Sequence, residues 1–160
     1  MWFSKKQFAK LPGIAIRSGP ADADDTTRVA KQPGQITTKR LGDAAEALAL
    51  AYLVRAGLRR IEANYRTPGR GGGEVDLIMR APDGTLVFVE VRQRKSSLHG
   101  GAAASISATK QRRLIFAARH YLMRFASPPP CRFDVVLVQG ELDAPDTVAI
   151  EWLRGAFDAN

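Results

Sequence analysis

The stretch GEVDLIMRAPDGTLVFVEVR, residues 73–92, decides the fold of the chain and raises the question of its function. Two apolar arms flank Pro82-Asp83-Gly84, a sequence typical of a three-residue hairpin loop in which a type I turn precedes a left-handed glycine. Asp and Glu are poor strand residues because they bury badly. The open end of this hairpin nevertheless carries four charged side chains, which are Glu74, Asp76, Glu90 and Arg92.

The turn also fixes the predicted register of the two arms. One face of the hairpin is wholly apolar and should be core; it pairs Met79 with Val87, Leu77 with Val89 and Val75 with Val91. The other face carries the charges; its pairs are Arg80–Leu86, Ile78–Phe88, Asp76–Glu90 and Glu74–Arg92. A two-residue turn would mix Glu90 into the apolar face, so we reject that register.

Two carboxylates therefore lie directly opposite each other, with the Cβ atoms of Asp76 and Glu90 about 5 Å apart. Like charges so placed repel, and a cation between them relieves the repulsion. Oxygen ligands favour Mg²⁺ or Mn²⁺, ions that can polarise a phosphate and activate a water. Arg92 could then contact a phosphate oxygen. The alternative is a solvated face on which Glu74 pairs with Arg92.

The elements around the hairpin predict an α/β fold. A helix begins at Thr37 or Thr38 and ends at Gly57, with one apolar stripe and Glu46 at its flank as a third candidate carboxylate. Residues 58–66 read as a strand, 107–125 as a second helix and 132–138 as a strand, with a short further strand at 148–153. The predicted order α-β-β-β-α-β gives a mixed sheet with helices against it.

Composition bounds the class of protein. The 160 residues give one domain, 37–160, after a weakly ordered basic arm, 1–36. The net charge of +8 favours an anionic partner, nucleic acid first, although the first 40 residues carry much of that excess. One cysteine and two histidines allow no internal disulfide and argue against a zinc site. No apolar run reaches membrane-spanning length and no signal peptide is evident, so we expect a cytoplasmic protein without a membrane partner.

A helix with a glutamate, then an acidic residue on one strand and Glu-x-basic on the next, resembles the restriction-endonuclease-like nuclease superfamily, including archaeal Holliday junction resolvases. It is more closely similar to the bacterial YraN family of predicted nucleases. The stretches that carry the resemblance, within residues 40–138, are GDAAEALALAYLVRAGL, EANYRTPGRGGGEVDLIMR, LVFVEVRQRKS, TKQRRLIFAARHYL and RFDVV. The resemblance implies a restriction-endonuclease-like mixed central sheet flanked by helices. It also implies a Mg²⁺- or Mn²⁺-dependent endonuclease that hydrolyses DNA, including branched or damaged DNA.

Carried over residue by residue, the resemblance implies that Glu46, Asp76 and Glu90 bind metal, with Glu74 as a further acidic residue. The chain departs from the pattern at position 92, where the nucleases have Lys and this chain has Arg. Arg stays protonated and cannot act as a base, so a catalytically decayed nucleic-acid-binding module is the alternative function. Lys110, on the sheet-facing side of the second predicted helix, is a candidate substitute for the missing lysine.

Basic residues that follow the acidic pair in the sequence, together with Arg70 on the glycine-rich loop before it, are candidates for contacts to a nucleic-acid backbone. They are Arg70, Arg92, Arg94, Lys95, Lys110, Arg112 and Arg113. Junction-cutting proteins are often two-fold dimers, so a homodimer is a further expectation, although no residue pattern identifies its interface. Asp134, which alternates with Val136 and Val138, favours a buried, arginine-paired structural role over a catalytic one. A third functional class is an interaction protein whose hairpin face docks a protein partner.

Overall fold

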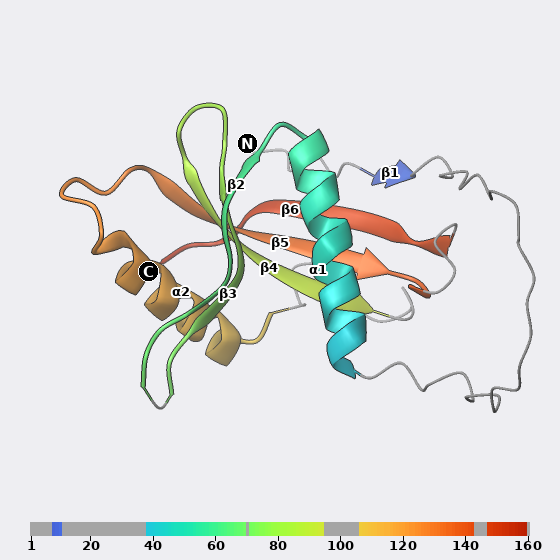
Figure 1. The fold of residues 1–160 in the computed structure, drawn as a ribbon, viewed down its shortest axis with the longest axis horizontal. Coiled ribbons are helices and arrows are strands. Elements are labelled where there is room, and N and C mark those ends of the chain that lie inside the picture. The colour runs from blue at the N-terminus through green and yellow to red at the C-terminus, as the bar shows by residue number, and fades with distance from the viewer. Residues whose placement is uncertain (1–7, 11–37, 70, 95–105, 143–146, 160) are drawn as a thin grey trace, which may run out of the picture.

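The computed structural model describes residues 8–10, 38–69, 71–94, 106–142 and 147–159, and shows two helices and a six-stranded sheet (Figure 1). The helices are α1 (Thr38–Arg55) and α2 (Ala108–Leu122). The strands are β1 (Phe8–Lys10), β2 (Arg59–Arg66), β3 (Glu74–Arg80), β4 (Leu86–Arg94), β5 (Cys131–Gln139) and β6 (Ala149–Phe157). Their spatial order is β1-β6-β5-β4-β3-β2.

The sheet is mixed, as the sequence predicts. Strands β4 and β5 are parallel because the chain crosses between them through α2, and every other neighbouring pair is antiparallel. Two elements go beyond the predicted order. The expected short strand at 148–153 is the nine-residue β6, and β1 adds three residues of the N-terminal arm to the edge of the sheet. The rest of the arm, 1–7 and 11–37, lies outside the described residues.

The predicted turn and its register are confirmed over the hairpin. The Gly84 N–H donates to the Ala81 carbonyl and the Ala81 N–H to the Thr85 carbonyl, both at 2.9 Å, and Gly84 has φ of 88°. The observed pairs are Leu77–Val89, Ile78–Phe88, Met79–Val87 and Arg80–Leu86, as predicted. Asp83 also accepts a hydrogen bond from the Thr85 N–H, which fixes the loop.

Alternate side chains of the central strands enter two cores, one under each helix. Leu77, Met79, Val87 and Val89 pack with Ala45, Ala49 and Leu53 of α1. Ile78, Leu86 and Phe88 pack with Leu114, Ala117 and Tyr121 of α2. The two helices therefore cover opposite faces of the sheet, which gives three layers. Neither helix of the described chain has the length and apolar character needed to cross a membrane.

One residue of the predicted apolar face lies elsewhere. Val75 joins the core under α2 rather than the core of Leu77 under α1, so its predicted face is wrong. The neighbouring strand β2 is irregular here, with a register shift between Arg60 and Glu62 and a positive φ of 53° at Asn64. The faces exchange between the Ala63–Leu77 pair, which lies against α1, and the Tyr65–Val75 pair, which lies against α2, and Asn64 stands between them.

A glycine brings β3 onto α2 at this end of the strand. A Cβ atom at Gly73 would lie 2.0 Å from the Arg113 carbonyl oxygen and 2.9 Å from the Ala117 Cβ. Thr67 closes the loop before it, because its hydroxyl accepts from the Gly73 N–H at 2.8 Å and its own N–H donates to the Gly73 carbonyl. The ends of the glycine-rich connection are thus anchored next to β3, while Arg70 lies outside the described residues.

Asp134 is a structural carboxylate, as the sequence favours. It is fully buried on β5 and accepts hydrogen bonds from Arg132 Nε (3.0 Å), Trp152 Nε1 (3.0 Å) and the Gly155 N–H (2.9 Å). These donors come from β5 and β6, so the carboxylate joins the two strands where their register shifts.

Candidate functional site

The central feature of the site is a fork in the sheet, where β3 and β4 stop pairing with each other. Their ladder ends at Leu77–Val89. Beyond that point β3 continues along β2 as far as Glu74–Arg66, and β4 continues along β5 as far as Arg94–Gln139. Figure 1 shows the β2–β3 hairpin diverging from β4 and β5. The three pairs predicted beyond the ladder, Asp76–Glu90, Val75–Val91 and Glu74–Arg92, therefore do not form.

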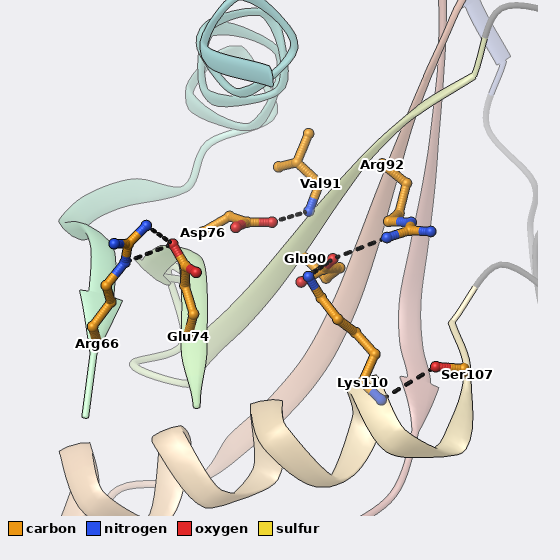
Figure 2. Close-up of polar contacts among 8 residues, drawn as sticks. All are labelled: Arg66, Glu74, Asp76, Glu90, Val91, Arg92, Ser107 and Lys110. Carbon is orange, nitrogen blue, oxygen red and sulfur yellow. Dashed lines mark hydrogen bonds and ion pairs between the residues drawn. The ribbon is translucent and has the colours of Figure 1, made fainter. Parts of the chain in front are cut away.

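Asp76 occupies the space that the divergence opens. Its Oδ2 accepts a hydrogen bond of 2.7 Å from the Val91 N–H, a donor that would otherwise lack a partner on β3 (Figure 2). The carboxylate thus holds the two strands together at the point where backbone pairing ends. Burial raises the pKa of Asp76. The hydrogen bond from the Val91 N–H and the charge of Lys110 act in the opposite direction, but their combined effect is smaller.

Glu90 lies on the other arm of the fork, and its side chain is almost fully buried. Its Oε1 is 3.0 Å from Lys110 Nζ and 3.8 Å from Arg92 Nη1. Its Oε2 is buried and has no hydrogen-bond partner among the described residues. Desolvation, followed by the nearby charge of Asp76, raises the pKa of Glu90 to about 7 despite the two cations.

The nearest cation comes from α2 rather than from β4. Ser107 caps α2, its hydroxyl accepting from the Lys110 N–H at 3.3 Å, so Lys110 lies in the first turn of the helix. From there its side chain reaches across to Glu90 (Figure 2). Arg92 points to the same carboxylate from β4 but remains more distant and 44 % exposed.

Glu46 and Glu74 lie around this pair. Burial and the charge of Asp76 raise the pKa of Glu46 on α1, and a hydrogen bond with Asn64 opposes that rise. Glu74 is engaged elsewhere, because its Oε1 accepts from Arg66 Nη2 at 2.8 Å and Nε at 3.0 Å (Figure 2). The Glu74–Arg92 pair of the alternative interpretation is thus replaced by Glu74–Arg66.

Asn64 and Arg66 are site neighbours that the sequence analysis missed. The residue type of Asn64 was a signal, because asparagine is one of the few residues that adopt positive φ readily. In the structure Asn64 lies opposite the part of β3 that contains Asp76. The remaining predicted contacts are dispersed. Arg112 and Arg113 are exposed on α2, Arg94 ends β4, and Lys95 lies outside the described residues.

The carboxylate pair has features that suit a divalent cation. Two close carboxylates with raised pKa values, one with an unpartnered buried oxygen, gain from a positive ion between them. No three His, Cys, Asp or Glu side chains of the described chain gather closely enough to form a metal cage. The residues therefore fit an ion that keeps most of its water and takes one or two carboxylates, as Mg²⁺ does.

Comparison with known sequences gives the family of the chain. The profile described as "Uncharacterised protein family UPF0102" matches residues 45–138, a span that includes Glu46, the fork and most of β5. The chain belongs to this family. UPF0102 is the YraN family, so the resemblance stated from the sequence is confirmed.

UPF0102 relatives extend over the whole chain. A UPF0102 protein of Polaromonas naphthalenivorans is 64 % identical and one of Polaromonas sp. 62 % identical, each over all of both chains. A UPF0102 protein of Albidiferax ferrireducens is 67 % identical over 77 % of this chain and 91 % of its own. The names of these relatives state the family and no activity.

Proposed function

We propose that this UPF0102 chain is a Mg²⁺- or Mn²⁺-dependent endonuclease that hydrolyses phosphodiester bonds in DNA, including branched or damaged DNA. The observation that carries the proposal is the buried pair of Asp76 and Glu90 at the fork, with Lys110 and Arg92 next to it. Carboxylates that are kept close together against their repulsion, and within reach of cations, are typical of a site built for an ion and an anionic substrate.

In this proposal Asp76 and Glu90 would hold the ion, and Glu46, whose pKa burial and the charge of Asp76 raise, would act from α1 through its charge. A bound Mg²⁺ or Mn²⁺ would supply polarisation of the scissile phosphate and a more acidic water. Glu90 must be ionised to take part, and a pKa of about 7 makes that state accessible near neutral pH. Arg92, which is partly exposed beside the pair, contacts a non-bridging phosphate oxygen and offsets its charge.

Lys110 has the position that best suits an amine in this chemistry. Its Nζ is already 3.0 Å from Glu90, whereas Arg92 cannot act as a base at any relevant pH. With Glu90 engaged by an ion, the Lys110 amine would be available to a phosphate oxygen or a water. Lys110 therefore offers the fork a lysine that position 92 does not provide.

The test is a cleavage assay with labelled linear duplex, single-stranded, flap and four-way-junction DNA in Mg²⁺, Mn²⁺ or EDTA. The Asp76→Asn/Glu90→Gln double variant removes two charges without changing side-chain shape. Glu141→Gln/Asp158→Asn, two exposed carboxylates away from the fork, is the matched control. Metal-dependent cutting lost only in the first variant supports the proposal, and cutting that survives in it overturns the assigned site.

A second function has its own observation. Arg92 stands where the family resemblance calls for Lys, and this favours a DNA-binding module that has lost catalysis. That module shows a salt-sensitive gel shift without cleavage under any divalent ion. In that case Arg92→Lys is the next variant, because restored cutting would assign the loss to this position. A folded sample that binds neither metal nor DNA would instead favour a protein-docking role.

A further inference from the structure

The side of α2 that faces away from the sheet presents an unusual surface. Arg112, Phe116, Arg119 and Met123 follow each other at intervals of four, three and four residues, so they share one side of the helix. We call these four residues the outer stripe. They lie opposite the buried face of α2, which consists of Leu114, Ala117, Ala118 and Tyr121. Phe116 is 53 % and Met123 74 % exposed, although both are large apolar side chains.

The charged residues of α2 itself are all basic. Helix α2 contains Lys110, Arg112, Arg113 and Arg119 and not one Asp or Glu. Surface helices commonly place acidic residues three or four positions from basic ones, and α2 has no such pair. Arg112 is exposed and donates a hydrogen bond to the Thr109 hydroxyl, and Arg119 is exposed and donates one to the Ala159 carbonyl. The charges that α2 carries are thus complementary to a polyanion.

We propose that the outer stripe binds an unpaired strand of DNA, with Arg112 and Arg119 on its phosphates and a base stacked on Phe116. Alternating cations and an exposed aromatic ring are what sequence-independent binding of single strands requires. A paired duplex keeps its bases stacked inside and offers Phe116 no face. An acidic protein partner fits the charge equally but does not need an aromatic platform between the arginines.

This inference deepens the proposed function by naming the substrate class. Helix α2 carries Lys110 to the fork from its first turn, and the outer stripe begins at Arg112, two residues further along the chain but about 200° around the helix. The stripe is about 16 Å long at 1.5 Å per residue, which accommodates several stacked nucleotides. A strand on the stripe therefore passes around the first turn of α2 to reach the fork, and the inferred substrate contains a single-stranded segment, as a flap or a partly opened junction does.

The test measures binding in EDTA, so it does not depend on catalysis. Labelled oligo-dT and a duplex of equal length are titrated with the full chain by fluorescence anisotropy at several salt concentrations. Phe116→Ala is compared with Val54→Ala, which trims a similarly exposed apolar side chain on α1. Arg112→Glu/Arg119→Glu is compared with Arg55→Glu/Arg59→Glu, which makes the same change of charge on exposed residues elsewhere.

We expect Phe116→Ala to weaken oligo-dT binding about five-fold or more while leaving its salt dependence unchanged. Arg112→Glu/Arg119→Glu should weaken it further and reduce the salt slope by roughly 1.4, the value for two phosphate contacts of a single strand. Equal effects of Phe116→Ala and Val54→Ala, or an equal loss of duplex binding, would overturn the inference and favour a protein partner. Phe116-dependent binding without any cleavage would sustain the inference while the proposed endonuclease fails.

Discussion

Glu90 should make the stability of the metal-free protein fall as the pH rises towards neutrality. Its pKa is about 7 in the folded protein against an ordinary value of 4.5. The folded state therefore holds a proton that the unfolded chain has released, and the resulting stabilisation is complete below about pH 4.5 and lost as pH rises through about 7. At about 1.4 kcal/mol per pKa unit, this difference amounts to roughly 3 kcal/mol over that window. The raised pKa of Asp76 acts in the same direction.

Urea unfolding in EDTA at several values between pH 5 and pH 8 measures this effect directly. Glu90→Gln keeps the shape of the side chain and cannot ionise, so its free energy of unfolding should fall less with pH than that of the wild type. The variant should exceed the wild type by about 2–3 kcal/mol at pH 8 and approach it at pH 5. Glu141→Gln, on an exposed carboxylate, should follow the wild-type curve. Parallel curves for the wild type and Glu90→Gln would refute the buried, repelled state of Glu90.

Two further predictions concern the framework of the site. Gly73→Ala should destabilise the chain by about 2 kcal/mol in urea unfolding, because its Cβ would lie 2.0 Å from the Arg113 carbonyl oxygen; Gly42→Ala, where nothing lies within 4 Å, should not destabilise it. Asp134→Ala should cost about 3 kcal/mol, since it leaves Arg132 and two other donors of the buried carboxylate without their acceptor. Unchanged midpoints for either variant would contradict the contacts assigned to these residues.

The hairpin could be predicted because its information is local. Gly84 must adopt positive φ in a three-residue loop, and that single requirement sets the pairing of Leu77 with Val89 and of Met79 with Val87. The helices follow equally from their apolar stripes, whose central residues are buried. Within the described residues, sequence patterning therefore determined which side chains of the paired hairpin enter which core.

The fork could not be predicted from the same pattern, because its cause lies outside the hairpin. Alternation placed Val75 beside Leu77, but β2 and β3 both change faces at the level of Asn64, so Val75 enters the other core. Alternation also extended the ladder to Asp76 and Glu90, whereas the Asp76 carboxylate accepts the Val91 N–H in place of a backbone oxygen. The change of faces coincides with the positive φ of Asn64 on the neighbouring strand, so the periodicity within β3 and β4 contains no trace of it.

Lys110 shows how the departure at position 92 can be compatible with a working site. A lysine on β4 would approach Glu90 along the strand, as Arg92 does at 3.8 Å. Lys110 approaches Glu90 from the helix layer, on α2, at 3.0 Å, and its backbone is fixed by the Ser107 cap. The chemistry depends on where the amine lies relative to the carboxylate. It does not depend on whether a strand or a helix carries that amine. If Asp76 and Glu90 are required for cleavage, Lys110→Met should therefore reduce it more than Arg92→Met does, even though Arg92 occupies the position that the sequence pattern assigns to the amine.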